Sequence, residues 1–504
     1  MTESAARPDP DPTSDPDPAW MSSGVPGLDA VLGAGLARGG VYLVEGPAGA
    51  GKTILASQIG FSQIARGGSV VCVTLVAESH SKWLGQLRSF GFFDEAAFPD
   101  RFLLVSGQGT VIDGGPDALL DLLGRLLSQR RPSVLILEGF QTLGDLGVGT
   151  TALVRFAHHL NALVSLADCV TLLLSMTDQT GTRAEHAIVD GLLRMSVHAH
   201  DARRVKYLEA VKLRGCAHLD GEHAFVLTPQ GMRVYPRIEA CGTRHPQAPE
   251  HFDAGLAFGV AGLDAMLESG LRAGTSTMLL GAPGTGKTLL GLQFLAQGAR
   301  QGEPCLFYGL FESPARLLAK ARRIGIDLDG AVADGRLQIA WQVPLERLLD
   351  ELADDLLSRV QRQGSRRVVI DGVDGLSVAA VRPERLTRLL TALVAELRTR
   401  GATVLLSEEL PVFSHDIVSP HVQASSVVEN VLLLRYVEMG MRLRRLISVL
   451  KTYDSGYDPT IRELLISDSG LEVGQAFAGI ESAMTGDARL VRDRLVVPPA
   501  GRGT

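Results

Sequence analysis

The chain has 504 residues, of which 45% are hydrophobic, and it carries a formal charge of −7 at neutral pH. This length predicts more than one domain with sizeable cores, and the acidic balance argues against a nucleic-acid partner. Five scattered cysteines without a C-x-x-C pair indicate reduced thiols rather than a zinc module, and no apolar run approaches the ~18 residues that span a bilayer. We therefore expect a cytoplasmic protein that has no membrane partner.

The two ends of the chain differ from its middle. Residues 1–19 repeat Asp-Pro and cannot bury apolar surface, so they predict a disordered acidic leader. Residues 486–504 are expected to be a flexible tail.

The first half opens with Gly24-Val25-Pro26-Gly27-Leu28-Asp29, followed by a strand-like run at 41–44 and a helix-like run at 53–65. Between these runs lies a G-x-x-x-x-G-K-[ST] loop. Its glycines let backbone N–H groups surround a phosphate, its lysine reaches the β/γ oxygens, and its threonine hydroxyl ligates Mg²⁺. The predicted nucleotide-binding residues here are Gly46, Gly49, Ala50, Gly51, Lys52 and Thr53.

The same pattern recurs in the second half. The entry reappears as Gly259-Val260-Ala261-Gly262-Leu263-Asp264, and both the lysines and the entry aspartates are 235 residues apart (287 − 52 and 264 − 29). This equal spacing indicates an internal repeat. The corresponding nucleotide-binding residues are Gly281, Gly284, Thr285, Gly286, Lys287 and Thr288.

Each half alternates short apolar runs with amphipathic runs, such as the leucine-rich face at 119–127. This alternation predicts an α/β fold with two tandem RecA-like P-loop NTPase domains, each a mostly parallel sheet flanked by helices. We place the domains at 20–236 and 253–485. A Pro-, Gly-, Arg- and His-rich linker occupies 237–252.

Two apolar strand candidates end in a carboxylate, at Glu138 and at Asp371. The carboxyl end of a parallel strand faces the nucleotide crevice, so these acids suit the second magnesium-holding position, beside Thr53 and Thr288. A solvated strand-end acid is the alternative.

A second pair of acids, Glu78 and Glu312, ends strand-like runs about 25 residues after each P-loop lysine. Each carboxylate could orient or deprotonate an attacking water or hydroxyl group. A lone glutamate in a loop is usually only solvated, but the recurrence in both halves favours the catalytic interpretation.

Lys212 and Arg214 lie two residues apart, on one face of a predicted strand. Such a pair could act on a neighbouring subunit's nucleotide as a catalytic arginine finger in trans. The alternative is an exposed basic edge that protects the sheet from aggregation.

Together these features resemble the KaiC-type ATPases, a RecA-superfamily group with two fused P-loop domains. The resemblance covers residues from about 22 to about 488, and it includes Arg88-Ser89-Phe90-Gly91 and the segments at 212–218 and 466–470. It implies a homo-oligomer, a hexamer, in which ATP and Mg²⁺ lie at subunit interfaces. Further nucleotide contacts implied by the resemblance are Ser89, Lys212, Arg214, His218 and Thr228 in the first half, and Arg445, Lys451 and Ser455 in the second.

The chain departs from the family pattern at its acids and cations. Where the family has two adjacent glutamates, the first being its main base, this chain has Ala77-Glu78 and Phe311-Glu312. Tyr453 and Tyr457 stand in the second half where Arg214 and His218 stand in the first. Losing a guanidinium that neutralises transition-state charge can cost ~10³-fold in rate, so the departures predict slow hydrolysis.

Clock-type members of this family autophosphorylate an adjacent Ser-Thr pair in the second domain. An ungapped count back from Lys451 reaches Ser425-Ser426. The resemblance therefore raises serine/threonine autokinase activity at these two residues, although serine pairs before a strand are common loop residues.

Three functions remain open from the sequence. The leading one is a ring-forming signalling ATPase whose nucleotide state is read by unidentified protein partners. The second is a non-hydrolysing scaffold in which ATP only joins subunits, and the missing first glutamates favour it. The third, a RecA-like DNA-handling ATPase, is disfavoured by the acidic charge and the lack of basic, aromatic-rich runs.

Overall fold

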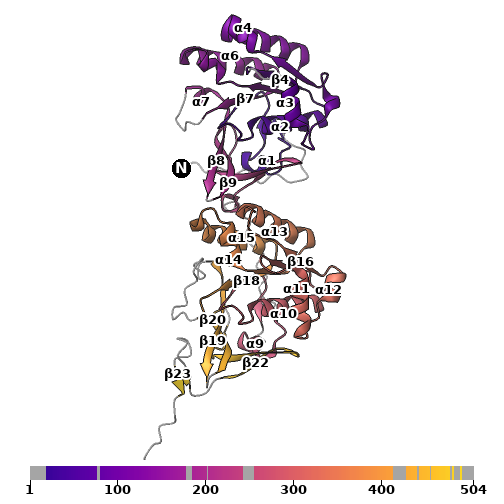
Figure 1. The fold of residues 1–504 in the computed structure, drawn as a ribbon, viewed down its shortest axis with the longest axis vertical. Coiled ribbons are helices and arrows are strands. Elements are labelled where there is room, and N and C mark those ends of the chain that lie inside the picture. Colours follow the sequence, from indigo (N-terminus) through magenta and orange to yellow (C-terminus); the bar gives the residue numbers. More distant parts are fainter. Residues whose placement is uncertain are drawn as a thin grey trace, which may run out of the picture. The chain divides into compact units, whose positions relative to one another are not determined.

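The computed structural model describes residues 19–76, 80–177, 184–200, 202–241, 255–268, 270–412, 427–439, 442–453, 456–476, 480–481 and 489–490. The chain forms two compact units that divide between Ala240 and Cys241 (Figure 1). Each unit contains a nine-stranded sheet with helices on its faces.

The sheet of the first unit has the strand order β11-β10-β9-β8-β3-β7-β6-β4-β5. Strands β8, β3, β7, β6, β4 and β5 run parallel, whereas β9, β10 and β11 continue the sheet as antiparallel neighbours. In chain order the strands are β3 (Val41–Gly46), β4 (Val70–Thr74), β5 (Phe102–Ser106), β6 (Val134–Glu138), β7 (Val170–Met176), β8 (Gly191–His200), β9 (Arg203–Leu213), β10 (His223–Thr228) and β11 (Gly231–Tyr235).

Helices cover both faces of this sheet, and a short pair of strands, β1 (Trp20–Met21) and β2 (Leu36–Ala37), precedes it. Helices α4 and α6 lie side by side in Figure 1. The helices are α1 (Leu28–Leu32), α2 (Lys52–Ala65), α3 (His80–Leu87), the 3₁₀ turn η1 (Glu95–Ala97), α4 (Gln108–Arg130), α5 (Thr142–Asp145), α6 (Thr150–Leu166), α7 (Ala184–Ile188) and α8 (Ile238–Cys241).

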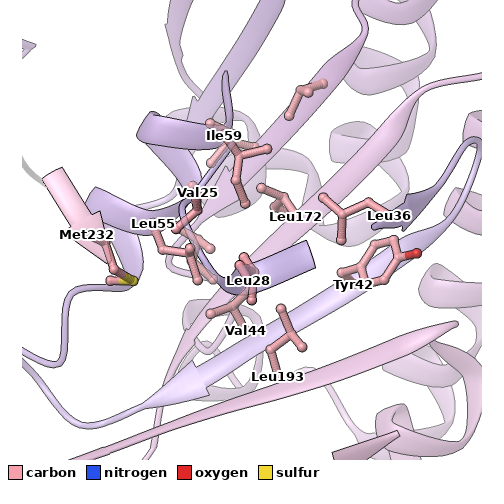
Figure 2. Close-up of a cluster of buried hydrophobic side chains, with 14 of the residues drawn as sticks. Val25, Leu28, Leu36, Tyr42, Val44, Leu55, Ile59, Leu172, Leu193 and Met232 are labelled. Atoms are coloured by element: carbon pink, nitrogen blue, oxygen red, sulfur yellow. The ribbon is translucent and has the colours of Figure 1, made fainter. Parts of the chain in front are cut away.

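Alternate residues of the central strands point to opposite faces, as a period of two requires. Val44 and Leu172 pack with Leu55 and Ile59 of α2 in the cluster drawn in Figure 2. Leu43 and its neighbours pack with α4 and α6 in a second cluster. Burial of one such leucine contributes roughly 1.5–3 kcal/mol. Because both faces are covered, the strands read as continuous apolar runs, which is why the sequence indicated a parallel sheet.

The sheet of the second unit repeats the same topology, with the order β16-β15-β17-β18-β14-β19-β20-β21-β22. Its parallel strands, in chain order, are β14 (Ser276–Gly281), β15 (Cys305–Gly309), β16 (Leu337–Trp341), β17 (Arg367–Asp371), β18 (Thr403–Glu409) and β19 (Asn430–Met439). The antiparallel extension is β20 (Arg442–Lys451), β21 (Arg462–Ser467) and β22 (Gly470–Ala476).

The second unit also has helices on both faces of its sheet. On β15, Phe307 packs with the cluster around α10, whereas the hydroxyl of the next residue, Tyr308, donates to the Leu352 carbonyl of α13. The helices are α9 (Ala261–Met266), α10 (Lys287–Arg300), α11 (Pro314–Arg323), α12 (Asp329–Ala333), α13 (Leu349–Gln363), α14 (Val373–Ala379), η3 (Pro383–Arg385) and α15 (Leu386–Thr399); the short pairs are β12 (Gly255–Leu256) with β13 (Leu271–Arg272), and β23 (Ile480–Glu481) with β24 (Arg489–Leu490).

The two tandem RecA-like α/β folds predicted from the sequence are therefore present. Of the six leucines at 119–127, four are buried and two, Leu122 and Leu126, are partly buried. The beginning of the predicted linker differs from expectation, because 238–241 form helix α8. Ile238 is buried, and the preceding Arg237 N–H donates to His223 Nδ1, so this segment packs on the first unit.

The largest of the fully buried side chains in the second unit is a charged one, Arg367. The side chain of Arg367 on β17 is fully buried, and its Nε lies 2.5 Å from Glu303 Oε2. Its Nη1 donates to the carbonyls of Ala257 and Phe294, and its Nη2 donates to Gln301 Oε1 at 2.7 Å. The guanidinium stacks over the Phe294 ring at 4.6 Å. Every polar edge of the guanidinium is thereby engaged, which is the condition for tolerating a buried charge.

We expect Arg367→Ala to destabilise the second unit by about 3 kcal/mol or more, because it leaves Glu303 and two buried carbonyls without their donor. Hydrogen exchange of β17 peptides across a urea titration measures this. The matched control is Arg362→Ala on α13, where the exposed side chain donates only to the Ser358 carbonyl, and its effect should stay within about 0.5 kcal/mol. Equal effects of the two substitutions would contradict the expectation.

Candidate functional site

In both units the P-loop lysine sits at the junction between a parallel strand and a helix. Gly286, immediately before Lys287, has φ +110°, and Gly51, before Lys52, has φ +107°; both values lie in the left-handed region that favours glycine. Each loop thereby turns sharply into the first turn of α10 or α2. The N-terminus of a helix presents free N–H groups to an anion.

The lysine ammonium groups fold back onto the ends of their strands. Lys287 Nζ donates to the carbonyls of Gly281 at 2.7 Å and Ala282 at 3.0 Å. Lys52 Nζ donates in the same way, to Gly46 at 2.7 Å and Pro47 at 2.8 Å. Burial lowers the pKa of Lys287, and Glu409, at 4.0 Å, partly offsets that effect. A phosphate beside Lys287 would favour its charged form further.

The strand-end acids meet the P-loop threonines. Thr288 Oγ1 donates to Asp371, at 3.0 Å from Oδ2, and Ser407 Oγ donates to Oδ1 at 2.6 Å. In the first unit Thr53 Oγ1 donates to Glu138 Oε1, while the Trp83 indole N–H donates to Oε2 at 2.8 Å. The extra methylene of the glutamate therefore does not prevent contact with the threonine.

These oxygen donors fit magnesium. Within the described ranges, no three His, Cys, Asp or Glu side chains gather as a metal cluster. Mg²⁺ is usually held by one or two protein oxygens, water and the phosphates of the substrate, so a hydroxyl beside a carboxylate is sufficient. Thr53 with Glu138, and Thr288 with Asp371, would hold it. When bound, magnesium neutralises charge on the terminal phosphates.

The second unit contains a cavity of about 500 Å³ at the carboxyl end of its parallel strands. It is large enough for the phosphate part of a nucleotide. The predicted residues that line it are Gly284, Gly286, Lys287, Thr288, Glu312 and Asp371.

Glu312 follows β15 and faces this cavity, but it is engaged by a neighbour. Lys320 Nζ on α11 lies 2.5 Å from Glu312 Oε1, and Glu312 Oε2 is buried without a hydrogen-bond partner. Phe311, the residue before Glu312, also lines the cavity. The corresponding residues of the first half, Ala77 and Glu78, lie outside the described residues, as do Ser425, Ser426 and Ser455.

Lys212 and Arg214 do share one face, but they point at α7 and the turn after it rather than at the P-loop of their own unit. Lys212 Nζ donates to the carbonyls of His186, Ala187 and Val189 at 2.8–3.0 Å. Arg214 donates to the Ala187 carbonyl as well. Lys451 repeats part of this arrangement with the Val428 carbonyl at 3.0 Å.

The remaining predicted contacts are dispersed in the first unit. Ser89 is exposed after α3, and His218 lies 3.5 Å from Asp220. Thr228, at the end of β10, closes the turn to β11 by donating to the Gly231 carbonyl. None of the described contacts joins these three side chains to one another, so the isolated chain does not assemble them into one site.

One cation beside each P-loop was not predicted as a pair from the sequence. Lys206 on β9 donates to the Gly49 carbonyl of the P-loop at 3.2 Å, just as Arg445 donates to the Gly284 carbonyl at 3.2 Å. The signal was available in the repeat, because Lys206 precedes Lys212 by the same six residues (212 − 206) that separate Arg445 from Lys451 (451 − 445).

Comparison with known proteins agrees with this geometry. The model of the family described as "ATPase: KaiC" matches residues 21–239 and again 256–477. The chain belongs to the KaiC ATPase family. KaiC-type ATP binding and ATPase activity follow for this chain in general terms.

Several KaiC relatives align along nearly the whole chain. The circadian clock oscillator protein KaiC of Parathermosynechococcus lividus is 26% identical over 488 residues, covering 92% of this chain and 87% of that protein. The circadian clock protein KaiC3 of Synechocystis is 27% identical over 492 residues, covering 92% and 94%. KaiC of Synechococcus elongatus is 25% identical over 483 residues, covering 93% and 91%. At 25–27% identity, the role of each site residue in this chain rests on its own contacts.

None of the helices in the described ranges combines the length and apolar character that a membrane span requires.

The environment of Asp371 predicts a pH dependence. Burial raises the pKa of Asp371 above its ordinary 3.8, and the hydrogen bonds from Ser407 and Thr288 only partly oppose this. The folded state therefore favours the protonated acid, so the ionised acid lowers stability. That cost is absent well below pH 3.8 and is fully present once the pH exceeds the raised value.

Without nucleotide and magnesium, we expect Asp371→Asn to unfold at a higher temperature than the parent at pH 7, with a difference that shrinks as the pH falls toward 4. Mg·ATP should raise the unfolding temperature of the parent more than that of the variant. Calorimetry of the second unit's transition measures both. Asp374→Asn removes another carboxylate that lines the cavity and controls for net charge. A lower unfolding temperature for Asp371→Asn at pH 7 would contradict the argument.

Proposed function

We propose that this KaiC-family chain binds Mg·ATP at both P-loops, assembles into a hexameric ring with nucleotide between adjacent subunits, and hydrolyses ATP slowly. The observation that carries the proposal is the repeated arrangement of lysine, threonine and strand-end acid. Lys52, Thr53 and Glu138 have the same relations as Lys287, Thr288 and Asp371. One arrangement of this kind could arise by chance, but two on equivalent strands support a common ligand.

In the second unit the proposed chemistry uses four side chains. Lys287 neutralises the terminal phosphates, while Thr288 and Asp371 hold the metal. Glu312 accepts a proton from the attacking water as the water oxygen bonds to the terminal phosphorus. The bond from that phosphorus to the bridging oxygen breaks, and its electron pair stays with ADP. Inorganic phosphate is the second product.

The basic pair of the first unit, Lys212 and Arg214, supports ring formation. The side chain of Arg214 is 55% exposed and contacts α7 instead of the P-loop of its own chain. A cation placed away from its own nucleotide suits a site completed by the adjacent subunit. In the second unit Tyr453, 50% exposed, stands at the equivalent position, so a cation for transition-state charge is missing there. The proposed turnover of the second site is correspondingly slow.

We expect Lys52→Ala and Lys287→Ala each to remove about half of the bound ATP, and the double variant to lose both nucleotide binding and phosphate release, since each lysine contacts the phosphates directly. Calorimetric titration and a phosphate-release assay measure these changes, and light scattering with and without ATP measures assembly. Arg362→Ala on α13, whose side chain does not line the P-loop cavity of the second unit, is the control.

The outcomes separate the alternatives. Undiminished ATP binding by the double variant would overturn the proposal. Binding with no phosphate release above that of the double variant would identify the non-hydrolysing scaffold. Salt-sensitive DNA binding near physiological ionic strength would revive the DNA-handling function. Which partner proteins read the nucleotide state has to be determined separately, by isolating them in each state.

The proposal extends, by family resemblance, to serine/threonine autokinase activity at Ser425 and Ser426. Glu312 would then accept the proton of a serine hydroxyl instead of a water proton. We expect incubation with Mg·ATP to add the mass of one or two phosphates, and Ser425→Ala/Ser426→Ala to abolish the addition. Intact-mass analysis with peptide mapping measures this, with a non-hydrolysable ATP analogue as the control. An unmodified peptide alongside measurable phosphate release would leave an ATPase without autokinase activity.

A further inference from the structure

The cavity of the second unit contains a cation that the P-loop chemistry does not use. Lys320 lies on α11, eight residues after Glu312, and both side chains line the cavity together with Lys287. Lys320 Nζ is 2.5 Å from Glu312 Oε1. The two side chains are 39% and 34% exposed, so the pair is only partly screened by water.

The ion pair engages one carboxylate oxygen of Glu312, and the other oxygen is buried. Oε1 already accepts the ammonium proton of Lys320, and Oε2 is buried without a hydrogen-bond partner. A general base has to lie within hydrogen-bond reach of the proton that it abstracts. In this arrangement one oxygen of Glu312 is occupied and the other is shut off from solvent.

The residues around Glu312 provide no substitute base at the neighbouring position. Phe311 directly precedes Glu312, and its ring lies against Gly372, where a Cβ would come within 2.4 Å of a ring carbon. An alanine at 372 would therefore displace the ring. The ring forms a wall of the cavity next to Glu312.

The lysine belongs to the second unit only. Counted from the equivalent acids Glu78 and Glu312, the position of Lys320 corresponds to Gln86 on α3 (86 − 78 and 320 − 312). The buried positions of the two helices agree with this alignment, because Leu87 and Ala321 are both 1% exposed. A neutral amide cannot hold a carboxylate as an ammonium does.

We propose that Lys320 restrains Glu312 by this ion pair, so that hydrolysis at the second site waits for the pair to open. The inference rests on the proposed function, in which Glu312 receives the proton of the attacking water. Lys320 acts through Glu312 and is a positioning residue. While the pair is closed, the water keeps its proton and the bond to the terminal phosphorus does not form. When the pair opens, Oε1 can accept that proton.

The test compares substitutions at 320 in the full-length chain with saturating Mg·ATP. Lys320→Gln installs the residue of the first unit and should raise phosphate release about three- to tenfold, because Glu312 is then free. Lys320→Arg keeps a cation beside the carboxylate and should leave the rate near that of the parent. Since Lys320 is more than a third exposed, both variants should retain the parent's unfolding temperature.

A second set of variants separates the restraint of Glu312 by Lys320 from a structural effect of the substitution at 320. In the Glu312→Gln background, Lys320→Gln should give no rise, because the base is already absent. A rise that persists in that background, an unchanged rate, or a slower rate for Lys320→Gln would each overturn the inference. ATP titration of the same preparations distinguishes a failure of the proposed function from a failure of the restraint by Lys320. If no variant binds ATP, the proposed function itself fails, whereas normal binding without acceleration removes only the restraint by Lys320.

Discussion

The site in each unit depends on one constraint, which is where a parallel strand ends. The last residue of the P-loop strand, Gly46 or Gly281, offers its carbonyl to the ammonium that lies six residues later. This contact keeps a partly buried cation at the carboxyl edge of the sheet, beside the free N–H groups of the following helix. Strands β6 and β17 end at the same edge, so their terminal acids meet the threonine after the lysine. Lysine, threonine and acid are thus brought together by the register of the sheet and not by loop flexibility.

Much of the fold and of each P-loop site could be predicted from the sequence, because the P-loops are local patterns and occur twice. The strand before the first P-loop extends two residues beyond the predicted run at 41–44, and the following helix starts one residue earlier than the predicted run at 53–65. The contacts that were not predictable join residues far apart in the chain. Trp83 reaches Glu138 across 55 residues, and Lys206 reaches Gly49 across 157. Periodicity carries no information about which side chains of non-adjacent elements face one another; only the folded register supplies it.

The two units share a fold but surround their acids differently. In the first, Glu45 on β3 is buried between His186 and Arg194, and the carbonyl of His186 accepts from Lys212. These contacts connect the P-loop strand to Lys212 at the end of β9. Leu280 stands in place of Glu45 in the second unit, so that link is replaced by apolar packing. This network fixes the position of Lys212, which supports the proposal that this cation acts at the nucleotide of an adjacent subunit.

The two units are alike in the groups that would hold a nucleotide and differ in the groups that would hydrolyse it. The groups that hold phosphate are duplicated closely, since each unit has a lysine on strand-end carbonyls and a second cation on the loop, Lys206 or Arg445. The groups that would move a proton or neutralise transition-state charge differ, with Phe311, Tyr453 and the Lys320–Glu312 pair in the second unit. Binding energy that is equal for substrate and transition state does not accelerate a reaction. We propose that a chain that keeps the first set and alters the second retains ATP-dependent assembly, while its turnover is set by how often Glu312 becomes available.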